Sequence, residues 1–187
     1  MRSMGIVMVL AALASTPLGA AELSRQVTDV TAIVEPEMGA GRVIFRADIS
    51  VEDESVAVRR ALLRVPLRSI EISRGMTLRV HPVTRDWARG AVSWTSGWSR
   101  AGGDFEDRVH GRAEVGPGRT GEAIFDITVL AKEILEHDVA NRGFILTIDP
   151  GQGLGLPGED LSRLGALSGA TVEVQYRPVP PRGRRAS

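Results

Sequence analysis

The chain has 187 residues, no cysteine, and 23 basic residues that balance 23 acidic ones. The missing thiols exclude disulfides, thiolate metal sites and thiol catalysis. The charge balance argues against a general attraction to nucleic acid or to acidic membranes, so only local clusters of charge can attract a charged partner.

The first 21 residues have the pattern of a secretory signal peptide. Arg2 precedes an apolar run over 5–14, and small residues including Ala20 and Ala21 end the segment. Such a run is too short to cross a bilayer, and small residues before a polar segment are what signal peptidase reads. We expect cleavage after Ala21, with Ala20 as the alternative, and a periplasmic or secreted product. No later segment of the sequence is long and apolar enough to span a membrane.

Removal of 21 residues from 187 leaves 166, about the size of one domain. Most of this domain, expected over 22–177, alternates between apolar and polar residues. A period of two residues predicts antiparallel strands with one face buried in the core and one face exposed to solvent, which we call the wet face. The expected strands are 27–34, 43–49, 61–67, 76–80, 91–95, 108–115, 122–126, 143–149 and 171–176. About nine strands of this spacing predict an all-β, jelly-roll-like sandwich of two packed sheets.

One segment has helical spacing instead. Thr128–Glu136 is predicted to form a single short helix at one end of the sandwich, with Asp126 or Thr128 as its N-cap. Its expected buried side consists of Val129, Leu130, Ile134 and Leu135. The stretch 150–158 reads as a glycine-rich loop, and 178–187 as a disordered tail rich in proline and arginine.

Several stretches resemble the DNRLRE domain family in the family's order. The most specific is Val80–Trp94, which is similar to the family's VYRVTRDWTEGTVTW. Weaker matches are Phe45–Ser50, Val58–Val65, Ala123–Thr128, Asn141–Leu146 and Thr171–Tyr176. Together they cover Val27–Tyr176. The resemblance implies a β-sandwich module of secreted and surface proteins, related to carbohydrate-binding modules that include alginate binders.

Motifs for catalysis and cofactors do not fit their required context. Residues 153–158 match the dinucleotide fingerprint G-x-G-x-x-G, but Pro157 stands where the helix should already run. Neither His81, His110 nor His137 has a partner at triad-like or ligand-like spacing, and no G-x-S-x-G elbow occurs. We therefore expect neither an enzyme nor a cofactor.

Carboxylates gather in two predicted loops. One group is Asp104, Glu106 and Asp107, and the other is Glu159 and Asp160. Solvated loop charge is the favoured interpretation, a structural calcium ion is the next, and a glycosidase would need two carboxylates converging in a cleft.

The candidate ligand-binding residues come from the expected wet face and one loop. Arg46, Arg64, Arg68, Arg79 and His81 have the outward parity on three successive strands, and Trp98 lies in a loop without apolar alternation. Trp87 and Trp94 are expected to pack inside or brace the loop. An arginine-lined face would suit carboxylate or sulfate, because each guanidinium offers two parallel hydrogen bonds. The alternative is that these arginines are separated or neutralised by carboxylates from other strands.

These observations predict a non-catalytic exported module that binds an acidic polysaccharide, such as a uronate polymer, at the cell surface or in the periplasm. The alternative is a structural or protein-interaction module of a cell-envelope assembly. Nucleic acid is not an expected partner.

Overall fold

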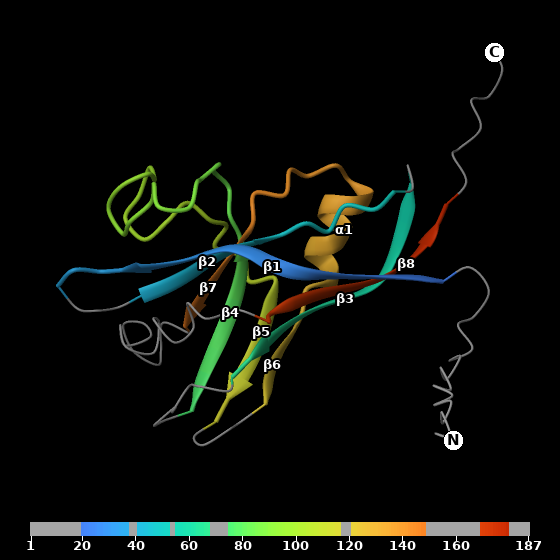
Figure 1. Ribbon diagram of the computed structural model, residues 1–187, viewed down its shortest axis with the longest axis horizontal. Helices are drawn as coiled ribbons and strands as arrows, with labels where there is room; N and C mark the ends of the chain where they lie inside the picture. Colours follow the sequence, from blue (N-terminus) through green and yellow to red (C-terminus); the bar gives the residue numbers. More distant parts are fainter. Residues whose placement is uncertain are drawn as a thin grey trace, which may run out of the picture.

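The computed structural model describes residues 20–37, 41–52, 55–67, 75–116, 121–148 and 169–179. Residues 1–19 of the expected signal peptide, Arg68, the glycine-rich stretch 150–158, the carboxylates Glu159 and Asp160, and the tail from residue 180 lie outside these residues. Ala21, the last residue of the expected signal peptide, is the first residue of a strand. The described part contains eight strands and one helix (Figure 1): β1 Ala21–Val34, β2 Gly41–Ala47, β3 Val56–Pro66, β4 Met76–Pro82, β5 Gly111–Val115, β6 Glu122–Asp126, α1 Thr128–Glu136, β7 Phe144–Ile148 and β8 Thr171–Pro178. The expected all-β class with a single short helix is confirmed.

The strands form two sheets that are joined through β1. Their order is β5-β4-β7-β2-β1-β8-β3-β6, and all pairs are antiparallel. The first sheet is therefore β1-β8-β3-β6 and the second sheet is β2-β7-β4-β5. This is the strand order of a jelly roll, as the sequence pattern predicts.

Strand β1 belongs to both sheets. Its first half, Ala21–Gln26, pairs with β8, and its second half, 27–34, pairs with β2. The register shifts between Thr28 and Thr31, where Asp29 has a φ of 50°. Such a bulge bends the strand and increases its twist, which lets one strand pass from one sheet to the other. In Figure 1, β1 is the long blue strand that crosses most of the molecule.

The main core lies between the two sheets. Phe45, Leu63, Leu78, Phe125 and Phe144 are fully buried there. Burying each such side chain contributes about 1.5–3 kcal/mol. The inward parity expected for the strands at 43–49, 61–67 and 76–80 is confirmed by this core.

Helix α1 packs against this core through Leu130 and Ala131. It spans the predicted residues, but Val129, expected on the buried side, is 54% exposed. Neither expected residue stands at the N-cap position, which Ile127 occupies, but Asp126 does accept a hydrogen bond on Oδ1 from the amide of Thr128 at 2.9 Å. Thr128 instead accepts a hydrogen bond on Oγ1 from the amide of Ala61 at 2.9 Å. This bond ties the start of the helix to β3.

A second, smaller core lies on the outer face of the second sheet. It consists of the buried Ile33, Ile44, Val83, Trp87 and Ile145, with Val92, Trp94, Trp98 and Phe105 packed against them. Most of the covering residues come from the long connection 83–110 between β4 and β5, which we call the covering loop. Ile44 was expected to face solvent and is fully buried, because the covering loop lies over it.

Nine strands were expected and the described part of the chain has eight, and the covering loop explains the difference. The predicted strand 91–95 is irregular backbone within this loop, and the strand predicted at 108 begins only at Gly111. The apolar side chains of Val92 and Trp94 pack on the outer face of the second sheet, and their backbone does not pair as a strand. At the other end of the chain, β8 runs through Pro178, beyond the expected domain boundary.

Candidate ligand-binding site in the covering loop

The arginines expected to share one face are divided between the two sheets. Arg64 lies on β3 in the first sheet, whereas Arg46 on β2 and Arg79 on β4 belong to the second. Because β3 lies in a different sheet from β2 and β4, outward parity on these three strands does not place their side chains together. The expected common arginine face is therefore wrong.

Arg64 is paired with carboxylates from both neighbouring strands. Its Nε lies 2.9 Å from Oε2 of Glu173 on β8, and its Nη1 lies 3.2 Å from Oε2 of Glu122 on β6. The hydrogen bond and charge of Glu173, followed by those of Glu122, raise the pKa of Arg64. For this residue the alternative of neutralisation by other strands is confirmed.

Arg46 is likewise engaged within the protein. Its Nη1 pairs with Oδ2 of Asp29 at 3.3 Å, at the bulge of β1. Its Nη2 donates to the carbonyl oxygen of Trp87, and its guanidinium carbon lies 4.6 Å from the centre of the Trp87 ring. Arg46 therefore helps to hold the covering loop on the sheet.

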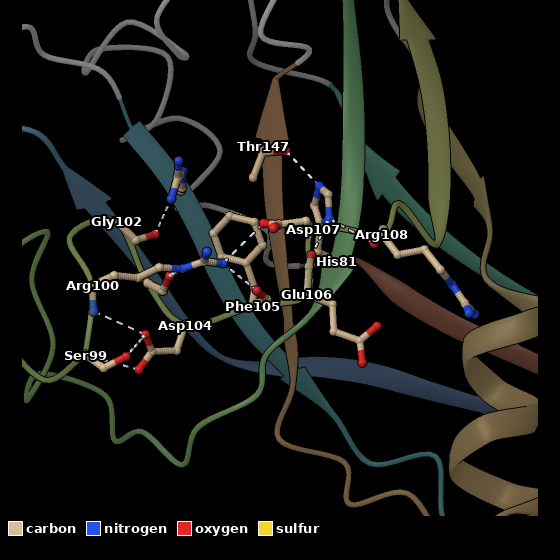
Figure 2. Close-up of polar contacts among 12 residues, drawn as sticks. His81, Ser99, Arg100, Gly102, Asp104, Phe105, Glu106, Asp107, Arg108 and Thr147 are labelled. Carbon is tan, nitrogen blue, oxygen red and sulfur yellow. Dashed lines mark hydrogen bonds and ion pairs between the residues drawn. The ribbon is translucent and has the colours of Figure 1, made fainter.

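His81 is buried and does not face solvent, contrary to the sequence-based expectation. Its side chain lies between β7 and the covering loop, and the residue is 4% exposed. Nδ1 is 2.9 Å from the carbonyl oxygen of Glu106 and 3.1 Å from that of Arg108, while Nε2 is 3.2 Å from Oγ1 of Thr147 (Figure 2). Burial is the main cause that lowers the pKa of His81. The ring is thus neutral, with Nδ1–H donating to the carbonyls and Nε2 accepting from Thr147.

The three tryptophans of the chain all lie in the covering loop. Trp87 is buried and donates from its indole nitrogen to the carbonyl oxygen of Arg142 at 2.8 Å. Trp94 is half-buried in the second core, so the expectation that Trp87 and Trp94 pack inside or brace the loop is confirmed. Trp98, the expected ligand contact, is also half-buried in this core, and its indole nitrogen donates to the carbonyl oxygen of Ser93 at 2.9 Å.

Phe105 is the centre of a cluster of arginines in the loop. The guanidinium carbons of Arg42 and Arg100 lie 4.9 Å and 4.7 Å from its ring centre. Arg42 also donates to the carbonyl oxygen of Gly102 at 2.5 Å, and burial lowers the pKa of Arg42. Gly102 has a left-handed φ of 82°, and a Cβ there would also displace the guanidinium of Arg42, so this position favours glycine.

Arg100 is held against the backbone on either side of Asp104. Its Nε donates to the carbonyl oxygen of Gly103 at 3.2 Å, and its Nη2 donates to that of Phe105 at 2.5 Å (Figure 2). The side chain is nevertheless 48% exposed. Such an orientation fixes the guanidinium before any ligand arrives, which lowers the entropic cost of binding.

Asp104 organises the same turn from inside. Its carboxylate accepts hydrogen bonds from the Ser99 amide at 2.8 Å, the Ser99 hydroxyl at 2.7 Å and the Arg100 amide at 3.2 Å. Arg85 adds an ion pair at 3.7 Å. The hydrogen bond from the Ser99 amide is the largest of the causes that lower the pKa of Asp104.

An open depression of about 430 Å³ lies over this turn. Its described lining is Thr84, Arg85, Ser99, Arg100, Asp104 and Phe105. Arg85 and Arg100 present exposed guanidinium groups to it, and their side chains are 54% and 48% exposed. Asp104 is the one carboxylate among these lining residues, and the bonds given above already engage it. The arrangement can bind a carboxylate or sulfate group by charge-assisted hydrogen bonds.

A smaller hollow of about 110 Å³ lies between the covering loop and helix α1. Glu106 and Glu133 line it, and the fully buried side chain of His110 lies between their carboxylates. Nε2 of His110 is 3.2 Å from Oε2 of Glu106, and Nδ1 is 3.7 Å from Oε2 of Glu133. The sequence analysis missed this contact, because residues 106–110 are irregular backbone and a spacing of four residues predicts contact only on a helix.

Within the described ranges, no group of three or more His, Cys, Asp or Glu side chains is placed to hold a metal ion. Helix α1, the one helix in this part of the chain, is too short to cross a membrane. No family model matches the chain, and no curated protein matches it either.

Proposed function

We propose that this protein is an exported, non-catalytic binding module whose covering loop binds an acidic polysaccharide through Arg85 and Arg100. The observation that carries the proposal is the meeting of two exposed guanidinium groups over one open depression. Guanidinium groups form charge-assisted hydrogen bonds to carboxylate and sulfate oxygens. Nε and Nη2 of Arg100 already donate within the loop, to Gly103, Phe105 and Asp107, so Arg100 would donate to the ligand from Nη1.

The other lining residues suit the same kind of ligand. The hydroxyls of Thr84 and Ser99 are groups that hydrogen-bond sugar hydroxyls, and Phe105 adds an aromatic surface. The depression is open, so a chain-like ligand could cross it without threading. Because Asp104 fixes the turn and Phe105 fixes Arg100, little ordering is left for the ligand to induce.

The resemblance to DNRLRE domains supports this proposal independently. Its most specific stretch, Val80–Trp94, covers the end of β4 and the first half of the covering loop. Both Thr84 and Arg85 of the depression fall within that stretch. Modules of this type that bind uronate polymers would need basic groups of the kind seen here.

The test is binding of the purified protein to dextran sulfate, a polyuronate and neutral dextran at low and raised salt. We expect salt-sensitive binding to the two anionic polymers and none to dextran. Arg85→Ala and Arg100→Lys should each weaken binding about tenfold or more, which corresponds to the loss of one charge-assisted contact. Arg64→Ala removes the same charge from the other sheet and should bind like the wild type.

Equal binding by wild type, Arg85→Ala and Arg100→Lys would overturn the proposed site. Absence of binding to any anionic polymer would overturn the proposed function and favour the protein-interaction alternative. Tryptophan fluorescence of each variant verifies that the covering loop is intact, because all three tryptophans lie in it.

A further inference from the structure

A buried histidine connects the second sheet to the segment that carries the proposed ligand site. His81 on β4 donates from Nδ1 to the carbonyls of Glu106 and Arg108, and its ring centre lies 5.1 Å from that of Phe105. On its other side, Nε2 meets the hydroxyl of Thr147 on β7. His81 is therefore an attachment point between the sheet and residues 105–108 of the covering loop.

The same segment positions Arg100. The Nη2 group of Arg100 donates to the carbonyl oxygen of Phe105, and its guanidinium lies over the Phe105 ring. Figure 2 shows Phe105 between the side chains of Arg100 and His81. A displacement of Phe105 away from His81 would thus also displace the guanidinium that faces the ligand.

The charged groups around His81 disfavour a second proton on its ring. Arg79 comes from the same strand and His110 comes from the covering loop, while Thr147 from β7 is uncharged. Arg108 contacts His81 through its carbonyl oxygen, and its guanidinium pairs with Glu133. The Glu106 carboxylate lies at Nε2 of His110, and His81 contacts only the Glu106 carbonyl. Burial first, and then Arg79 and His110, lower the pKa of His81, whereas its two backbone hydrogen bonds act in the opposite direction.

We propose that His81 is a positioning residue for the ligand site, and that its protonation detaches residues 105–108 and weakens binding in acid. This inference rests on the proposed function, because it concerns the regulation of that same site. The neutral ring holds Phe105 and Arg100 in the binding geometry. A charged ring is unfavourable while it is buried. This cost disappears when residues 105–108 move away and water reaches His81.

The sign of the effect follows from proton linkage. A histidine has a pKa of about 6.5 in an unfolded chain. Since the attached state of the loop lowers the pKa of His81, the detached state binds protons more readily. The attachment is therefore at full strength above about pH 6.5 and weakens as the pH falls from there towards the lowered pKa.

Two other groups could alter this response. His81 is not among the residues that line the depression, and Phe105 lies between, so direct attraction of an anionic ligand to a charged His81 is weak. His110 is the other histidine beside the covering loop, and its ring nitrogens face the carboxylates of Glu106 and Glu133. It does not contact Phe105 or Arg100 in any bond given above, so removing it should leave the acid response intact.

The test is affinity for dextran sulfate between pH 7.5 and pH 5.0, because sulfate esters keep their charge over this range. Wild-type affinity should fall severalfold on acidification, because protonation of His81 favours the detached state of residues 105–108. His81→Gln can keep one donor to the Glu106 carbonyl but cannot take up the proton. Its affinity at pH 7.5 should be lower than that of the wild type, because Phe105 loses the ring packed against it, and the remaining affinity should not change between pH 7.5 and pH 5.0. His110→Gln should retain that response.

Each result bears on one claim. Binding at pH 7.5 that does not change at pH 5.0, or that weakens equally in His81→Gln, would overturn the role of His81 while leaving the proposed function intact. No binding at pH 7.5 would instead overturn the proposed function. Amide hydrogen exchange of the ligand-free wild type, corrected for its intrinsic pH dependence, gives a second readout if His81→Gln does not fold. Acid should selectively raise exchange in residues 105–108, and unchanged exchange there would also overturn the inference.

Discussion

Replacing Asp104 by asparagine should destabilise the covering loop while leaving the sheets folded. The carboxylate accepts three hydrogen bonds, from the Ser99 amide, the Ser99 hydroxyl and the Arg100 amide, and it lies 3.7 Å from Arg85. Asparagine keeps one acceptor oxygen, but its amide nitrogen would replace the oxygen that faces the Ser99 amide. A donor would then face a donor, and one charge-assisted hydrogen bond would be lost.

The magnitude follows from that count. A hydrogen bond to a charged group contributes about 1.5–3 kcal/mol, and the site borders an open depression that gives water some access. We therefore expect Asp104→Asn to lower the free energy of loop unfolding by about 2 kcal/mol. The matched control is Asp107→Asn, three residues on. Asp107 lies 3.4 Å from Arg100, but its side chain is 88% exposed, and the loss of such a surface pair should change stability by less than about 0.5 kcal/mol.

The assay is urea unfolding followed by tryptophan fluorescence, which reports the covering loop, and by far-ultraviolet circular dichroism, which reports the sheets. Because the pKa of Asp104 is lowered in the folded protein, its contribution is present at neutral pH and is lost as the pH falls through that pKa. The gap between wild type and Asp104→Asn should therefore narrow below about pH 4. Equal destabilisation by Asp104→Asn and Asp107→Asn, or a gap independent of pH, would refute this reasoning.

Three further substitutions test the packing under and around the loop. Ile44→Ala should cost about 2–5 kcal/mol by urea unfolding, as expected for a fully buried residue; a change below about 0.5 kcal/mol would mean that the outer face of β2 is solvated. Trp87→Phe should cost about 1–2 kcal/mol, because it leaves the Arg142 carbonyl without its indole donor, and an unchanged urea midpoint would contradict that bond. Arg64→Ala should leave the thermal midpoint unchanged within the scatter of repeated scans, and a clear drop would show that its surface ion pairs matter more than their exposure suggests.

Local periodicity was sufficient to place most of the secondary structure. The strand Glu122–Asp126 and the helix Thr128–Glu136 have the predicted bounds. Periodicity could not show that the outer face of the second sheet is covered. The sequence does carry a signal for this, because Val43, Ile44 and Phe45 are apolar without interruption, as expected for a strand buried on both faces.

The candidate site was harder to predict because it depends on neighbours that are distant in the sequence. Parity alone gave Arg64 a solvent-facing position, but its partners Glu122 and Glu173 are defined by strand pairing. Arg85 and Arg100 have no periodic pattern, and an irregular loop brings them together. Asp104 was read as loop charge, whereas its surroundings make it the organising residue of the turn.

The most direct test of the central claim is a map of backbone amide chemical shifts as a short sulfated or uronate oligosaccharide is added at pH 7.5. The account predicts concentration-dependent shifts in residues 84–85 and 99–107, with little change around Arg64 on the first sheet. Shifts centred on Arg64 and its neighbours on β6 and β8, or no shifts in the covering loop at saturating ligand, would contradict the account.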